Sequence, residues 1–168
     1  MSKYRVLRVT GAAFAALAAV IGIATILGLS VSRVHAQHPD IATDWINFWN
    51  SRNANSAAAL FADNVVYEDV TFGVVNTGIA ELEAFAQGYF GTAPPDARFT
   101  LLASDLRGEH GTIEWLWTFT TTATFFGPTP GKQVAVRGVA VIELHGNKIV
   151  RNSDYWDMAT VLRQIGQL

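Results

Sequence analysis

The chain has 168 residues, of which half are hydrophobic and 15% are charged, and its formal net charge is −2. This length allows one domain with a sizeable core, and the apolar content is too high for a disordered chain. The absence of cysteine excludes a disulfide scaffold, a cysteine nucleophile and thiolate metal sites. The slight negative charge argues against nucleic acid as a partner.

The first 36 residues differ from the rest of the chain. Three basic residues precede an uncharged run from Val9 to Ser32, and a helix of about 20 apolar residues spans a bilayer. The basic start and apolar middle also fit a secretory signal, with a cut after Ala36. We therefore expect residues 1–36 to be a cleaved signal peptide or a membrane anchor through residues 9–32. Both alternatives place residues 37–168 outside the cytoplasm, as a secreted, periplasmic or membrane-anchored domain.

The start of this remaining segment, residues 37–168, predicts helices. Ile41, Trp45, Phe48 and Trp49 follow the spacing of one apolar helical face. We expect a second, short helix over residues 57–61. A third helix is expected after Gly78, with an apolar face from Leu82 to Phe90, and Pro94 and Pro95 end it.

Most of the other segments read as strands. β-branched and aromatic residues or strict alternation predict strands over 65–71, 99–106, 113–125, 134–144 and 148–156, with a closing helix over 158–165. The fold class is therefore α+β: a curved antiparallel sheet that cups three N-terminal helices. The open end of this cone is the expected place for an apolar pocket.

Two aspartates are the strongest candidates for chemistry. Alternation places Asp154 on one strand face with Trp156, and a carboxyl group beside an indole in an apolar pocket has a raised pKa and can take and give a proton. The alternative for Asp154 is a structural hydrogen bond, or an ion pair with Arg137 or Arg151. Asp69 shares a strand face with Tyr67, and its alternative is a surface carboxylate at a strand end.

Arg137 is the third charged candidate. It lies in the middle of an apolar strand, where it needs a carboxylate or a ligand as its partner. The aromatic side chains form the core, and several of them would also line a ligand pocket. The expected substrate-binding residues are Trp45, Trp49, Tyr67, Phe85, Tyr89, Trp115, Trp117, Arg137 and Trp156.

Several short segments resemble a known family. They are LFADN at 60–64, YED at 67–69, TPGK at 129–132, VRG at 136–138, GNKI at 146–149 and DYWD at 154–157. Residues 38–168 resemble the NTF2-like superfamily and its SnoaL-like branch, which contains polyketide cyclases and relatives of ketosteroid isomerase. This resemblance implies a cone formed by a curved sheet around helices.

The resemblance also implies roles for single residues. Asp69 matches the general base of the ketosteroid isomerases, but Trp45 stands where they have an oxyanion-hole tyrosine, so their oxyanion hole is not implied here. Asp154 resembles one aspartate of the epoxide hydrolases, whose arginine and second aspartate are missing. The SnoaL-like cyclases use a single aspartate for acid–base chemistry, and the resemblance implies that Asp154 has this role.

These observations lead to one functional expectation and two alternatives. We expect residues 37–168 to bind a small lipophilic molecule and, if they form an enzyme, to act as a cyclase or isomerase without cofactor or metal, using Asp154 and Asp69. The alternatives are a non-catalytic carrier and an interaction domain, and a homodimer is the expected assembly.

Overall fold

The computed structural model describes residues 40–168. The predicted signal peptide or anchor therefore lies outside the described residues. Within 40–168, no helix is long and apolar enough to cross a membrane.

The three predicted N-terminal helices form, and the strand Phe61–Asp69 lies between the second and the third in the chain. The first, α2 (Ile41–Ser51), is capped by Asp40, whose side chain accepts a hydrogen bond from the Thr43 N–H at 3.1 Å, and the helix buries one apolar face. A short 3₁₀ turn (Ala54–Ser56) and α3 (Ala57–Leu60) then lead into the first strand. The third helix, α4 (Ile79–Thr92), follows a β-hairpin and contacts β1 and β2.

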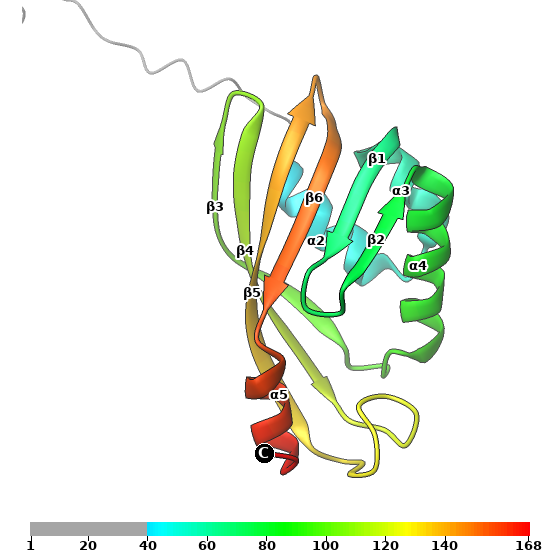
Figure 1. Cartoon of the computed structure of the whole chain (residues 1–168), viewed down its shortest axis with the longest axis vertical. Coiled ribbons are helices and arrows are strands. Elements are labelled where there is room, and N and C mark those ends of the chain that lie inside the picture. The colour runs from blue at the N-terminus through cyan, green and yellow to red at the C-terminus, as the bar shows by residue number, and fades with distance from the viewer. Residues whose placement is uncertain (1–39) are drawn as a thin grey trace, which may run out of the picture. The chain divides into compact units, whose positions relative to one another are not determined.

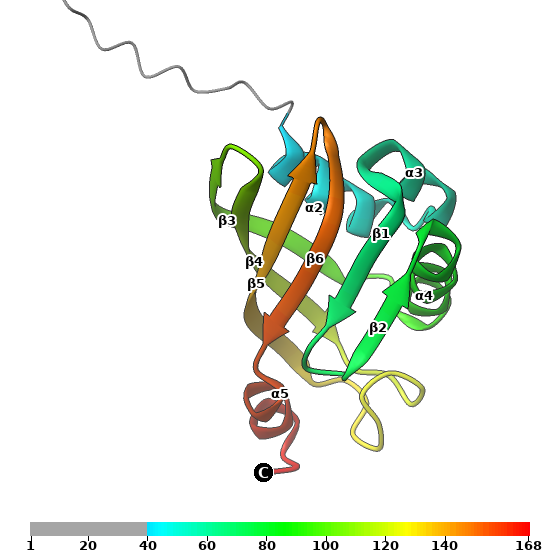
Figure 2. The ribbon, with the colours of Figure 1, turned by 45° about the horizontal axis from the view of Figure 1, so that its top comes forward.

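Six strands form one open, curved sheet (Figures 1 and 2). They are β1 (Phe61–Asp69), β2 (Val74–Thr77), β3 (Arg98–Arg107), β4 (His110–Thr120), β5 (Gln133–His145) and β6 (Lys148–Trp156). Their order across the sheet is β2-β1-β6-β5-β4-β3. In both views α2 lies behind the sheet and α4 lies beside β2. The last helix, α5 (Met158–Ile165), contacts β5.

The prediction of a wholly antiparallel sheet is wrong, because the sheet is mixed. The first strand, β1, pairs in parallel with the last, β6, while every other neighbouring pair is antiparallel. Hairpin turns reveal antiparallel neighbours in a sequence, but a parallel pair joined through most of the domain leaves no local signal. This parallel pair matters because it carries both candidate aspartates.

The alternation predicted for β4 is confirmed. Ile113, Trp115, Trp117 and Phe119 are buried on the helix-facing side of the sheet. The strand ends at Thr120, however, and the predicted continuation to Phe125 is wrong. The chain turns over residues 121–132, where Phe126 and Gly127 both have positive φ angles.

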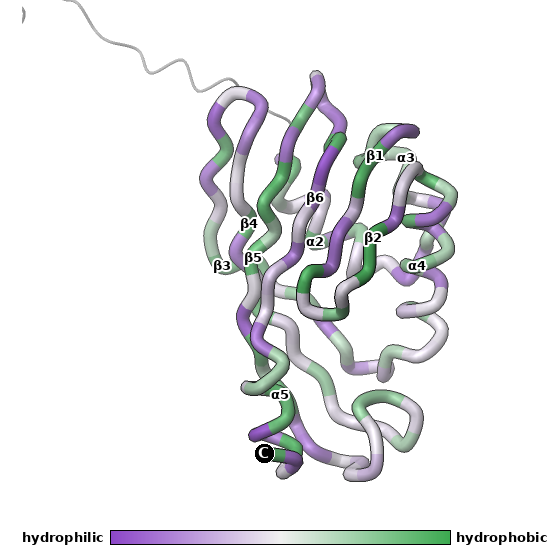
Figure 3. Tube along the Cα trace, in the orientation of Figure 1, coloured by the Kyte–Doolittle hydropathy of each residue, from purple (hydrophilic) through white to green (hydrophobic). Residues whose placement is uncertain are grey.

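The β1–β2 hairpin carries hydrophobic residues, as Figure 3 shows. Phe72 in this hairpin is 48% exposed.

Candidate active site

The parallel pairing of β1 and β6 places Asp69 directly opposite Asp154. Two residues earlier, Tyr67 stands opposite Asn152 in the same register. Because side chains two positions apart point to the same face of a sheet, all four face the helices. All four residues are buried: the exposed fraction is 6% for Asp69, 4% for Asp154, 2% for Tyr67 and 0% for Asn152.

The buried carboxylate of Asp154 has only one of its two oxygens in a hydrogen bond. Its Oδ2 accepts a hydrogen bond from the Tyr67 hydroxyl, whereas no partner for Oδ1 exists among residues 40–168. Burial raises the pKa of Asp154 to about 7, and the negative charge of Asp69 adds to this rise. The Tyr67 hydroxyl and the nearby Asn152 side chain lower this pKa, although Asn152 Nδ2 has no hydrogen-bond partner among residues 40–168.

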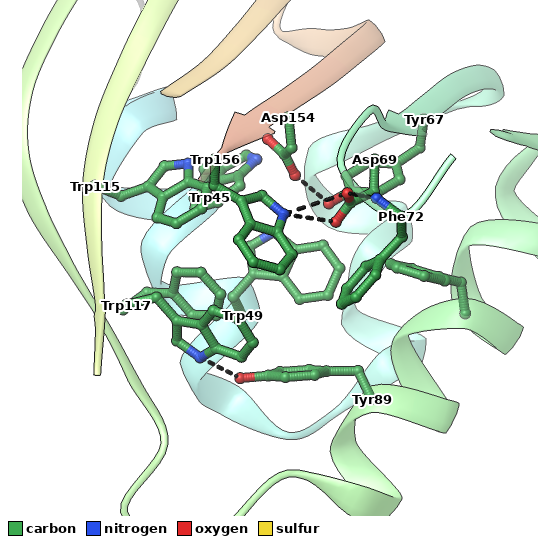
Figure 4. A pocket seen from close by; sticks show the side chains of 12 residues that line it. Trp45, Trp49, Tyr67, Asp69, Phe72, Tyr89, Trp115, Trp117, Asp154 and Trp156 are labelled. Atoms are coloured by element: carbon green, nitrogen blue, oxygen red, sulfur yellow. Dashed lines mark hydrogen bonds between the residues drawn. The ribbon is translucent and has the colours of Figure 1, made fainter. Parts of the chain in front are cut away.

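Asp69 has more hydrogen-bond partners than Asp154. Its Oδ1 accepts the Phe72 backbone N–H at 2.9 Å, and the Trp156 indole N–H lies 3.3 Å from Oδ1 and 3.2 Å from Oδ2. Burial raises the pKa of Asp69, and these donors partly offset that effect. Figure 4 shows the Trp156 indole directed at the Asp69 carboxylate beside Asp154.

The tyrosine beside this pair stays protonated. Burial and the adjacent Asp154 charge raise the pKa of Tyr67 well above its usual value. Tyr67 therefore remains a hydrogen-bond donor to Asp154 throughout the neutral range. The negative charge of Asp69 makes loss of the proton from Asp154 less favourable.

A cavity of about 50 Å³ lies next to the two aspartates. Its other walls are all aromatic: Trp45, Trp49, Tyr67, Phe72, Phe85, Tyr89, Phe99, Trp115, Trp117 and Trp156. A water molecule occupies roughly 30 Å³ of liquid, and a pocket for a drug-sized ligand measures about 300–1,000 Å³. The aromatic rings therefore fill most of the cone, and the cavity suits a ligand of few atoms.

Hydrogen bonds hold several of these rings in place. The Trp45 indole N–H donates to Asn152 Oδ1 at 2.9 Å, and the Trp117 indole N–H donates to the Tyr89 hydroxyl at 3.0 Å. The indole N–H groups of Trp49 and Trp115 are buried without a partner among residues 40–168. The Trp45 N–H is thus engaged in a structural hydrogen bond. The N–H groups of Trp49 and Trp115 are donors without an acceptor among residues 40–168.

The structure brings together both predicted aspartates and all but one of the predicted binding residues. Phe72 and Phe99 also line the cavity, and the sequence reading missed them. Phe99 is buried early in β3, where its aromatic type and strand position were a usable signal. Phe72 lies in the turn after β1, where no periodic pattern could indicate its direction.

Arg137 is the exception, because it does not line the cavity. Arg137 does share a strand face with Val139 and Val141 and does pair with a carboxylate, that of Glu114, but this is the outer face of β5, where its side chain is exposed. Val139 and Val141 make this outer face apolar without making it the face that lines the cavity. An exposed pair of this kind contributes little to stability.

No cluster of three His, Asp or Glu side chains suited to a metal ion forms within residues 40–168. The charged chemistry of the cavity therefore rests on two carboxyl groups, with Tyr67 and Tyr89 as the other titratable groups in its walls.

The SnoaL-like domain family matches residues 42–152. The chain belongs to the SnoaL-like family. No curated protein matches its sequence.

Solved structures with this fold include three close matches in shape. A protein of ketosteroid isomerase-like fold from Catenulispora acidiphila, in complex with trimethylamine, is 25% identical, with a TM-score of 0.67 over 77% of this chain and 95% of that one. A SnoaL-like polyketide cyclase from Agrobacterium tumefaciens is 20% identical, with a TM-score of 0.63 over 76% and 96%. A protein assigned as such a cyclase from Shewanella putrefaciens is 17% identical, with a TM-score of 0.67 over 79% and 98%. The last two likenesses establish the fold.

Proposed function

We propose that this SnoaL-like domain binds a small, largely apolar ligand in its aromatic cavity and catalyses cofactor-independent proton transfer on it. Asp154 is the main acid–base group and Asp69 is its partner. The observation that carries the proposal is the buried Asp154 carboxylate in the cavity wall, whose Oδ1 has no hydrogen-bond partner within residues 40–168. With a pKa of about 7, this group can take and give a proton at neutral pH.

The size of the cavity supports a small ligand. At about 50 Å³ it has no room for a steroid or a polyketide unless several rings turn aside. The similar protein from Catenulispora acidiphila was solved with trimethylamine, a molecule on the scale that we propose here.

Unused polar groups support a ligand that carries an oxygen atom. The buried indole N–H groups of Trp49 and Trp115 have no partner among residues 40–168, and a buried donor without an acceptor costs about 1–3 kcal/mol. A carbonyl oxygen of the ligand would satisfy such a donor and would be stabilised as negative charge develops on it. Proton abstraction next to a carbonyl is therefore the reaction class that we favour.

Hydrogen–deuterium exchange tests this reaction without knowledge of the product. The full-length chain is mixed with a panel of small ketones in D₂O, and loss of the proton signal next to the carbonyl is followed by NMR. We expect exchange above the buffer rate with at least one ketone and a loss of about 100-fold or more in Asp154→Asn. Glu114→Gln, which removes a carboxylate from the outer face, is the matched control and should keep the rate.

Two outcomes would contradict the proposal. One is an exchange rate no faster than buffer for every ketone. The other is an unchanged rate in Asp154→Asn. Ligand binding that survives Asp154→Asn, together with no turnover of any ligand by the wild-type chain, would instead favour the non-catalytic carrier.

A homodimer remains our proposal for the assembly. Val141 and Tyr155 lie on the outer face of the sheet and are 43% and 45% exposed, which supports a contact between two sheets. Sedimentation of the full-length chain with and without Tyr155→Lys tests it, because the dimer should weaken in the variant. A wild-type chain that stays monomeric at high concentration would contradict it.

A further inference from the structure

We propose that the cavity recognises a small alkylammonium ion, with the methyl groups against aromatic ring faces and the positive charge beside Asp69 and Asp154. This inference deepens the proposed function: the ligand of the cavity would carry a cationic alkyl group in addition to the carbonyl oxygen proposed above. It depends on that function only in taking this cavity as the ligand site, and not on proton transfer.

The aromatic walls are the first observation. All five tryptophans of the chain line this one cavity. The rings of Trp117 and Trp156 meet at 80° with centroids 5.7 Å apart, and those of Trp49 and Tyr89 meet at 76° with centroids 5.9 Å apart. Ring faces attract cations, and the attraction is strongest for tryptophan. A box of rings set at right angles is the arrangement that surrounds an alkylated ammonium group.

The charge of the walls is the second observation. Asp69 and Asp154 line the cavity, and among residues 40–168 no Lys, Arg or His lines it. Arg52 is the basic residue whose charge acts on Tyr89. Its guanidinium donates to the backbone carbonyls of Ala93, at 3.2 Å, and Pro94, so its direct contacts are to backbone. When the two carboxyl groups are ionised, the charge that lines the cavity is therefore negative.

The unused oxygen of Asp154 is the third observation. Asp69 accepts hydrogen bonds from Phe72 and Trp156, but Oδ1 of Asp154 has no partner within residues 40–168. A buried carboxylate is costly unless it is neutralised or paired with a cation. A neutral ligand leaves this cost in place, whereas a cation removes it.

The chemistry of the walls also selects among cations. Hard metal ions need six or more oxygen ligands, and the ten aromatic walls offer hydrocarbon instead. An alkylammonium ion can give up its weak hydration and contact the rings directly. The small volume favours few carbon atoms, and Phe72, 48% exposed, is the wall that can turn outward to admit them.

Titration calorimetry on the full-length chain at pH 8 tests the inference with two probes. Tetramethylammonium and tert-butanol have the same number of non-hydrogen atoms and nearly the same shape, but only the first is charged. We expect tetramethylammonium to bind at least tenfold more tightly than tert-butanol. Potassium chloride at the same concentration controls for ionic strength and should give no binding.

Variants then locate the source of the preference. Asp154→Asn should weaken tetramethylammonium binding at least tenfold and leave tert-butanol binding nearly unchanged. Glu114→Gln on the outer face should change neither. If Asp154→Asn does not fold, the pH dependence of the wild-type chain replaces it: tetramethylammonium affinity should rise as Asp154 loses its proton near pH 7. Asp69, Tyr67 and Tyr89 are the other titratable groups in the same walls, and both tyrosines stay protonated there.

Each contrary result has its own meaning. Equal affinity for the two probes would overturn the charge preference while leaving a neutral ligand and the proposed function intact. Binding of neither probe would also overturn this inference, and the ketone exchange assay would then decide the proposed function alone. A preference for tetramethylammonium that persists in folded Asp154→Asn and Asp69→Asn variants would show that the carboxylates do not supply it.

Discussion

Asp69 and Asp154 stand opposite each other on β1 and β6, the parallel pair of strands in the sheet. These strands come from opposite ends of the domain, so the pair of carboxyl groups exists only in the folded chain. Burial removes both groups from water and raises the pKa of each, and the negative charge of Asp69 further raises the pKa of Asp154. The geometry of one strand pair thus sets the acid–base properties of the site.

The pH dependence of stability should reveal Asp154 directly. Its pKa rises from 3.8 to about 7 on folding, so between these values the folded chain binds more protons than the unfolded chain. The free energy of unfolding should therefore fall as pH rises from about 4 to about 7, by roughly 4 kcal/mol at most. Urea unfolding at pH 5 and pH 8, followed by tryptophan fluorescence, measures this difference.

Asp154→Asn is the decisive variant for that measurement. It cannot titrate, so its stability should depend less on pH and should exceed that of the wild type at pH 8. Asp96 and Asp157 have lowered pKa values and act in the opposite direction, but only in more acidic solution. A wild-type chain that becomes more stable from pH 5 to pH 8 would contradict the assignment.

Tyr67→Phe should shift the proton affinity of Asp154 and leave the carboxylate in place. The Tyr67 hydroxyl donates to Oδ2 and thereby lowers the pKa of Asp154. Its removal should raise that pKa, so that activity as a base appears only at higher pH. The pH profile of ketone exchange measures the shift, and an identical profile in Tyr67→Phe would show that the hydroxyl only fills space.

The alternation of aromatic and polar residues made much of this site predictable. It placed Trp115 and Trp117 on one face of β4, and it placed Asp154 and Trp156 on one face of β6. In the structure Trp115 and Trp117 are buried together, and Asp154 and Trp156 line the same cavity. Strand alternation is a local property, and a sequence displays it without any knowledge of the partner strand.

Features that depend on distant pairing were not predictable. The parallel register of Asp69 with Asp154 has no local signal, and neither does the choice of the inner face for β5. Val139 and Val141 made the strand face of Arg137 look like a core face, but the buried face of β5 is formed by residues such as Val136 and Ala140. The small volume of the cavity depends on how ten aromatic rings pack together, which no pattern of residue types reveals.

The N-terminal segment should place the domain outside the cytoplasm. We expect the chain produced in a bacterial host either to lose residues 1–36 or to stay in the membrane through residues 9–32. Intact mass of the recovered protein separates these alternatives. In both, protease added to spheroplasts should digest the domain while a cytoplasmic control protein survives. Full-length chain protected inside the spheroplasts would contradict export.

Gly138→Ala should damage the cavity through its tryptophan wall. Gly138 lies opposite Trp115 in the pairing of β5 with β4, and a methyl group there would overlap the Trp115 ring. The indole is packed against Trp45 and Phe99 and cannot move freely, so we expect a loss of about 1–3 kcal/mol in unfolding free energy and weaker ligand binding. Gly88→Ala is the control, because nothing lies within 4 Å of the added methyl group in α4. It should stabilise the helix by about 0.5–1 kcal/mol, and equal effects of the two substitutions would show that the contact with Trp115 is unimportant.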